Sequence, residues 1–303
     1  MLFLGVSTGG SSIMELFPRW ADVLGVKAGI QGRDLPLAGP PDVYVQAVRE
    51  IADDPGTAGA LVTSHKVDVY RHAGELFQEL DGYAHLCREI SCISKRDGRL
   101  VGHAKDPITA GLAMEHMLGP DYFRDRDAEV LCLGAGGAGT AITVHLSAQS
   151  HRPQRVIVAD RDPDRIKALA SIVEEARAAN VDLTTVGAPE DADRLLALPR
   201  GSLVINATGL GKDLPGSPLS GNATFPEQAV VWDLNYRGDL EFLRQARDQA
   251  ERRGLRLHDG WRYFLHGWTE VIAEVYDLDL TPALFERLAA TADPFRPATP
   301  ASV

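Results

Sequence analysis

A glycine-rich segment between an apolar strand and an apolar helix carries the clearest chemistry in this 303-residue chain. Residues 131–139 read LCLGAGGAG and contain the spacing G-x-G-x-x-G. Glycines at this spacing permit a tight turn, a close approach of backbone to a pyrophosphate, and close packing of helix on strand. The free N–H groups at the start of the following helix favour an anion. The segment predicts a dinucleotide site formed by Gly134, Gly136, Gly137, Ala138 and Gly139.

An acid follows at the distance where the ribose of a dinucleotide needs one. The strand predicted over 155–159 leads into Asp160, about 20 residues beyond the glycine segment. Its carboxylate can accept hydrogen bonds from both ribose hydroxyls and would repel a 2′-phosphate. Arg161 and Arg165, which could hold that phosphate, come next. We expect NAD to be favoured, with NADP as the alternative; the competing interpretation of the segment is a glycine-rich turn that binds nothing.

The elements that must position this site alternate between strand and helix, as in α/β proteins with parallel sheets. Around the glycine segment the apolar runs predict strands at 129–133, 155–159, 182–186, 202–205 and 229–233. Asp162 and Pro163 predict the start of a helix that runs to residue 179. We therefore expect a Rossmann-type dinucleotide-binding domain with a parallel sheet.

The first third of the chain predicts a second α/β unit. Strands are expected at 2–6 and 58–63, a hairpin at 90–95 and 99–103 around Asp97-Gly98, and helices at 13–24, 41–51, 68–77 and 80–87. A helix is expected from Pro107 to residue 118, and helical structure again over 259–290. The proline-rich end, 292–303, is expected to be disordered.

Composition narrows the class of protein. Lys and Arg number 31 against 42 Asp and Glu, a net charge of −11 that disfavours nucleic acid and anionic membrane surfaces as partners. The chain has no apolar run of membrane-spanning length and no secretory signal pattern at its N-terminus, so we expect a cytoplasmic location. Its three cysteines and nine histidines show no metal-ligand spacing, and we expect no metal.

Seven stretches in a fixed order resemble the shikimate dehydrogenase family over roughly residues 1–280. The glycine segment matches that family's G-A-G-G-A-G letter for letter, and VINAT at 204–208 matches its I-N-A-T. The other stretches resemble its N-terminal serine loop, its N-V-T-x-P-x-K segment, its G-x-N-T-D segment and its later D-x-x-Y and Q-G motifs: GVSTGGS at 5–11, LVTSHK at 61–66, GHAKD at 102–106, DLNY at 233–236 and HG at 266–267.

The resemblance implies a catalytic pair, Lys66 and Asp106. Oxidation of a secondary alcohol requires an acid/base group within hydrogen-bond reach of the alcohol oxygen. A lysine with a neighbouring carboxylate can fill that role, because the carboxylate fixes the direction of the ammonium. The resemblance also implies substrate contacts and further cofactor contacts. The substrate contacts are Ser11, Ser12, Thr63, Ser91, Tyr236 and His266, and the cofactor contacts are Asn206, Ala207 and Thr208.

The substrate pocket departs from the family pattern. EISC at 89–92 takes the place of A-V-N-T, so Ser91 replaces an asparagine; Ala104 and Lys105 replace the asparagine and threonine of G-x-N-T-D. Ile13 takes the place of a second serine in the N-terminal loop, unless Ser12 is its equivalent. Each lost polar group removes about 1–3 kcal/mol of hydrogen bonding in a dry pocket. Shikimate, quinate or a related cyclitol therefore remain alternative substrates.

The sequence thus predicts an NAD(P)-dependent oxidoreductase acting on a cyclic polyol, with a non-catalytic dinucleotide sensor as the alternative. The resemblance implies an N-terminal α/β substrate-binding domain at 1–106, completed by helices at 260–291, and a Rossmann domain at 107–259. We expect a small polyol or polyol acid as the partner, and a monomer or homodimer.

Overall fold

The computed structural model describes residues 1–212 and 214–297, which divide into two compact units. The first unit is built on Met1–Thr109 and Leu265–Arg296, and the second on Ala110–Phe264. The two divisions fall within helices α5 (Asp106–Leu118) and α10 (Trp261–Tyr276), so both helices contribute residues to both units. In the described part of the chain, no helix combines the length and apolar character that crossing a membrane requires.

The first unit contains a six-stranded mixed sheet with the strand order β2-β1-β3-β5-β6-β4. Pairing is parallel from β2 to β3 and antiparallel between β3, β5 and β6. Its elements are β1 (Leu2–Gly5), α1 (Ile13–Leu24), β2 (Gln31–Asp34), α2 (Pro41–Asp53), β3 (Gly59–Val62), α3 (Lys66–Ala73), η1 (Gly74–Leu76), β4 (Glu79–Leu80), α4 (Gly82–Cys87), β5 (Cys92–Arg96), β6 (Arg99–His103), α11 (Pro282–Ala292) and η2 (Asp293–Phe295).

The C-terminal helices complete this first unit. The indole N–H of Trp20 on α1 donates to the carbonyl oxygen of Leu288 on α11 at 2.8 Å. The rings of Phe3 and Trp268 meet edge to face, with centroids 4.9 Å apart. Buried aromatic contacts of this kind fix the returning segment on the N-terminal sheet and helix.

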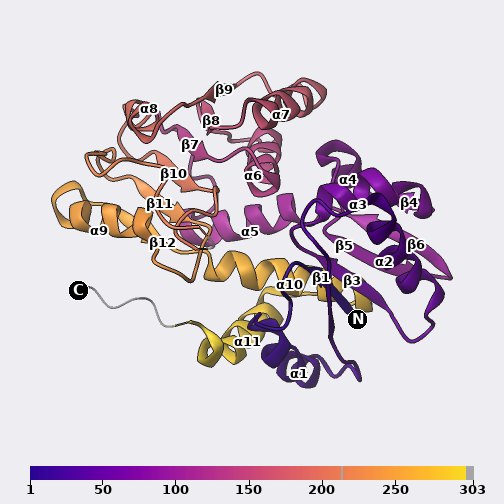
Figure 1. Ribbon diagram of the computed structural model, residues 1–303. Helices are drawn as coiled ribbons and strands as arrows, with labels where there is room; N and C mark the ends of the chain where they lie inside the picture. The colour runs from indigo at the N-terminus through magenta and orange to yellow at the C-terminus, as the bar shows by residue number, and fades with distance from the viewer. Residues whose placement is uncertain (213, 298–303) are drawn as a thin grey trace. The chain divides into compact units, whose positions relative to one another are not determined.

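The second unit contains a six-stranded, wholly parallel sheet with the order β12-β11-β10-β7-β8-β9. In Figure 1 this sheet extends from β9 at the top of the unit to β12 at its lower end. Its elements are β7 (Val130–Leu133), α6 (Gly137–Ala148), β8 (Val156–Asp160), α7 (Pro163–Glu175), β9 (Val181–Thr185), α8 (Pro189–Arg194), β10 (Leu203–Asn206), β11 (Val230–Asp233), α9 (Glu241–Arg253) and β12 (Arg256–His258). This is the Rossmann strand order, and β7 and β10 flank the point where the order reverses.

The expected α/β class and Rossmann-type sheet are confirmed, and the strands that prediction missed share one physical property. β2, β4 and β12 each lie at a sheet edge, and none of their residues is buried. An edge strand paired on one side and open to solvent needs no apolar pattern. In contrast, β7, β10 and β11 are buried at every residue and were apparent as apolar runs.

Helix boundaries differ from the prediction where local caps decide them. The expected helical stretch 259–290 is two helices, because Asp277 takes a positive φ of 55° and Thr281 caps α11 ahead of Pro282. The helix expected over 80–87 begins at Gly82, because Asp81 accepts a hydrogen bond from the Ala84 N–H. The helix expected at 68–77 is instead α3 followed by η1.

The prediction of a disordered tail over 292–303 is wrong for its first residues. Ala292 is a buried residue of α11, and η2 follows it. Residues 298–303 lie outside the described part of the chain.

Ile13 belongs to the core of the first unit. It is the first residue of α1 and is fully buried, as are Leu16 and Phe17 on the same face of the helix. Ile13 therefore stabilises the helix by packing, and Ser12, which precedes α1, remains the alternative equivalent of the second family serine.

Replacing Ile13 by serine should lower the free energy of unfolding by about 3 kcal/mol, since it leaves a cavity and buries a hydroxyl. Ile13→Val, the matched control, should cost only about 1 kcal/mol. Urea denaturation of both variants measures the difference. A serine variant as stable as the valine variant would contradict the core assignment.

Candidate active site

Lys66 and Asp106 are brought together although 40 residues separate them in sequence. Lys66 is the first residue of α3, after the short turn that follows β3, and Asp106 is the first residue of α5, after β6. The Lys66 ammonium donates to a carboxylate oxygen of Asp106 in a close ion pair. The side chains are only 23% and 11% exposed, so the pair is shielded from bulk water yet still accessible.

A second carboxyl group, Glu89, lies in the loop between α4 and β5, where it interacts electrostatically with both Lys66 and Asp106. The backbone places it there, because the N–H of Ile90 donates to the carbonyl oxygen of Lys66 at 3.0 Å. Glu89 is 1% exposed. In the sequence, Glu89 is marked only as an acid where the family motif has alanine, which does not reveal its burial.

Burial and neighbouring charges shift the pKa values of both Lys66 and Glu89. Burial alone would lower the pKa of Lys66, but the charges of Asp106 and Glu89 outweigh it and raise that pKa above its ordinary value. Burial, together with the charge of Asp106, raises the pKa of Glu89 to about 8. The lysine is therefore held as an ammonium, while Glu89 takes up its proton far more readily than an exposed glutamate does.

The polar residues expected near the pair have distinct surroundings. The Thr63 hydroxyl donates to the carbonyl oxygen of Leu4 at 3.2 Å, at the ends of β1 and β3. The hydroxyl of Ser91 is buried and accepts the N–H of Lys105 at 2.7 Å, which fixes the backbone just before Asp106. Ser11 and Ser12 are half-buried in the loop before α1.

Two other expected substrate contacts lie in aromatic surroundings. The ring of His266, which is 6% exposed, stacks on Phe285 with centroids 3.9 Å apart. Tyr236, in the second unit, packs against Trp261 and Phe264 with centroids 5.3 and 4.9 Å away. The structure places Tyr236 and His266 in different units, and it places Lys66 and Asp106 in the same unit as His266.

The glycine segment forms the turn between β7 and α6. Gly134 has a φ of 113°, which an L-residue rarely adopts. A Cβ on Gly139 would lie 1.9 Å from the carbonyl oxygen of Gly134, so the helix can approach the strand only without a side chain there. Gly136 is the N-cap of α6, whose first residues are Gly137, Ala138 and Gly139. This turn leaves the first N–H groups of a twelve-residue helix available to an anion.

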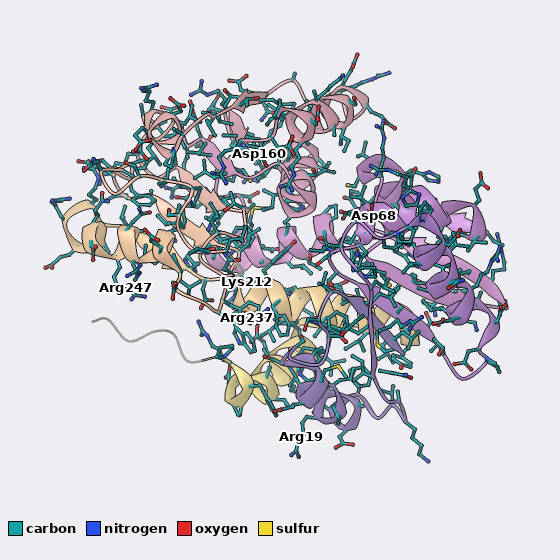
Figure 2. The ribbon with its side chains drawn as sticks, in the orientation of Figure 1. Arg19, Asp68, Asp160, Lys212, Arg237 and Arg247 are labelled. Carbon is teal, nitrogen blue, oxygen red and sulfur yellow. The ribbon has the colours of Figure 1, made fainter. Side chains whose placement is uncertain are left out.

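Asp160 is fixed at the end of β8, beside this turn. One of its carboxylate oxygens accepts the N–H of Ala135 at 2.7 Å, and the other accepts the N–H of Asp162 at 2.9 Å. Arg165 lies 3.9 Å from the first oxygen and is 58% exposed, and Arg161 is also exposed. Figure 2 labels Asp160 at this end of the sheet. Two backbone hydrogen bonds thus hold the Asp160 carboxylate in place. The distant, exposed Arg165 offsets only part of its negative charge.

A cavity of about 380 Å³ opens beside Asp160. It lies wholly within the second unit and its walls combine apolar side chains with the polar groups just described; they include Leu133, Asp160, Arg161, Arg165, Thr208 and Leu210. The glycine turn, which has no side chains, and the N-terminus of α6 fit the phosphates of a dinucleotide. The fixed carboxylate of Asp160 fits its ribose. Residues 1–212 and 214–297 contain no group of three His, Cys, Asp or Glu side chains arranged to hold a metal.

The ends of β10 and β11 are joined by a buried polar network. The Asn206 amide donates to Asp233 at 3.1 Å, and its oxygen accepts the hydroxyl of Thr208 at 2.7 Å. The N–H of Ala207 donates to the carbonyl oxygen of Leu133 at 2.7 Å, next to the glycine turn. The segment Asn206–Thr208 therefore lies beside the glycine turn, at the point between β7 and β10 where the strand order reverses.

The chain resembles known dehydrogenases in sequence. A family model described as the saccharopine dehydrogenase NADP binding domain matches residues 130–212. The chain is 31% identical over 254 residues to the shikimate dehydrogenase (NADP+) of Methylobacterium radiotolerans, covering 82% of this chain and 80% of that enzyme. It is 27% identical over 186 residues to the one of Methanocaldococcus jannaschii, covering 60% of each.

Solved structures share the fold over 96% of the chain. Quinate dehydrogenase from Corynebacterium glutamicum in complex with NAD superimposes with a TM-score of 0.75 at 22% identity, covering 96% of each chain. Shikimate 5-dehydrogenase from Listeria monocytogenes in complex with shikimate and NAD gives 0.73 at 17% identity, covering 96% of this chain and 94% of that one. At these identities the structures show the fold alone. The extent of the match to the Methylobacterium enzyme shows more: the chain belongs to the shikimate dehydrogenase family.

Proposed function

We propose that this protein is a nicotinamide-dinucleotide-dependent dehydrogenase that interconverts a secondary alcohol and a ketone on a small cyclic polyol. The observation that carries the proposal is the shielded ion pair of Lys66 and Asp106 in a chain of this family. Shikimate, quinate and related cyclitols are the substrate class, and the altered pocket leaves the choice among them to a substrate panel. We propose that the first unit binds the polyol and the second the dinucleotide.

Lys66 and Asp106 are proposed to move the alcohol proton. The bound nicotinamide dinucleotide supplies or accepts the hydride. Lys66 donates a hydrogen bond to the substrate oxygen and relays its proton, and Asp106 holds the ammonium in that direction. The restricted exposure of the pair strengthens these interactions, because fewer water molecules compete for the ammonium.

Substrate contacts are proposed for Ser11, Ser12 and Thr63, with Tyr236 and His266 as further contacts carried over from the family resemblance. Ser91 is proposed to act on the backbone, since its hydroxyl is already bonded to the N–H of Lys105. Direct contact of Ser91 with substrate would require that bond to be shared or broken.

The glycine turn, Asp160, Arg161 and the segment Asn206–Thr208 are proposed as the cofactor site. Relatives do not decide between the two cofactors, because the curated relatives are named for NADP+ and the Corynebacterium structure contains NAD. We propose a preference for NAD, supported by the rigid carboxylate of Asp160, which a 2′-phosphate would have to approach.

A dinucleotide sensor without activity is the alternative function. Family membership and the intact ion pair favour the enzyme over this alternative. A sensor would enhance the fluorescence of reduced nicotinamide on binding, yet turn over no member of a polyol panel.

Replacing Lys66 by alanine should lower kcat at least a hundredfold, because the reaction loses its proton-transferring group. Absorbance of the nicotinamide cofactor measures the rate with the best substrate of the panel. Lys27→Ala, which removes an exposed lysine of the same unit, should leave the rate unchanged. Circular dichroism must show that the Lys66 variant is folded; near-full turnover in that variant would contradict the proposed role.

Replacing Asp160 by asparagine should lower the ratio of kcat/KM for NAD to that for NADP at least tenfold, because one negative charge facing the 2′-phosphate is removed. Asp164→Asn is the matched control, since Asp164 is an exposed acid near the start of α7 and does not line the cavity. A wild-type preference for NADP, unchanged in the Asp160 variant, would show that the nearby arginines decide the selectivity.

A further inference from the structure

Glu89 is a buried acid whose charge is not neutralised by a dedicated partner. Its side chain is 1% exposed, and one carboxyl oxygen has no hydrogen-bond partner among the residues that the structure describes. Leaving a buried carboxylate oxygen unsatisfied costs free energy, so such a group usually has a function or holds a proton.

The groups that interact with Glu89 come from three elements, and two of these groups are charged. Lys66 faces it from α3 and Asp106 from α5. The buried thiol of Cys87 lies at the end of α4, and the charge of Glu89 helps to raise its pKa, so this thiol stays protonated. Arg88, the preceding residue, is itself exposed. One ammonium is therefore shared by two carboxyl groups in a site with little water.

We propose that Glu89 is a positioning residue that sets the protonation state of the Lys66–Asp106 pair, and so makes alcohol oxidation and ketone reduction depend on pH in opposite directions. The proposal rests on the proposed function. Glu89 stands where the family motif has alanine, so the motif assigns this residue no role.

The charge of the cluster explains the opposite dependences. With Glu89 protonated, Lys66 and Asp106 form a neutral pair that has a proton to give and little tendency to accept another. With Glu89 ionised, the cluster carries one net negative charge and accepts the alcohol proton as hydride leaves the substrate carbon. The proton ends on the cluster and the electron pair leaves with the hydride, so the step balances. Oxidation thus favours the ionised form and reduction the protonated form.

The pKa of Glu89 lies within the pH range in which the enzyme can be assayed. Burial and the charge of Asp106 raise its pKa to about 8, which puts both forms within the pH range of ordinary assays. The native state then binds more protons than the unfolded state between about pH 4.3 and pH 8, since an unfolded glutamate titrates near 4.3. The free energy of unfolding should therefore fall as pH rises across that window.

The test compares wild type, Glu89→Gln, Glu89→Asp and the control Glu79→Gln, an exposed acid of the same unit. Glutamine mimics protonated Glu89 at every pH. At pH 6 the Glu89→Gln variant should match wild type in both reaction directions. At pH 9 it should oxidise the alcohol at least tenfold more slowly and reduce the ketone faster than wild type. Glu89→Asp should restore the wild-type direction of both profiles, and Glu79→Gln should change neither.

Urea unfolding from pH 5 to pH 8.5 gives a readout that needs no turnover. Wild type should lose stability relative to Glu89→Gln as pH rises, whereas Glu79→Gln should follow wild type. Parallel unfolding series, or unchanged rate profiles in Glu89→Gln, would overturn the proposal. If wild type turns over no polyol, the proposed function fails, and the unfolding series alone then decides whether Glu89 holds the proton.

Discussion

The ion pair between Lys66 and Asp106 is the interaction around which the proposed catalytic site of the first unit is built. An ammonium and a carboxylate this shielded are stable only together, since removing one partner from a buried pair costs about 3–5 kcal/mol, and somewhat less where water still reaches the groups, as it does here. The fold delivers both groups to one place by ending β3 just before α3 and β6 just before α5. Between these two strands lies β5, and the loop that leads into it brings Glu89 to the same place.

In the second unit, backbone groups rather than side chains form the core of the proposed cofactor site. Six parallel strands end on one side, and the order of the strands reverses between β7 and β10. Glycine is required at the turn after β7, because a Cβ on Gly139 would collide with the Gly134 carbonyl. The network of Asn206, Thr208 and Asp233 satisfies the polar groups at the neighbouring strand ends, where burial raises the pKa of Asp233 to about 7. The polar groups at the switch point are thus fixed by the protein itself.

The sequence predicted what depends on local pattern and missed what depends on tertiary context. The strands buried on both faces were found because each is a continuous apolar run, whereas β2 and β12 at the sheet edges carry no such signal. The motif order identified Lys66 and Asp106, and the structure brings them together. Glu89 could not be found this way, because its burial and its distance from the pair are set by the loop before β5. The burial of Ile13 in the core could not be predicted from the match to the family's serine loop either.

A double-mutant cycle on Lys66 and Asp106, followed by turnover of the best polyol substrate, tests the central claim most directly. If the two residues act as one unit, the double alanine variant will be about as slow as the slower single variant, because the first substitution already disables the pair. If the losses in kcat multiply, the residues act independently, and the account of a single proton-transferring pair is contradicted.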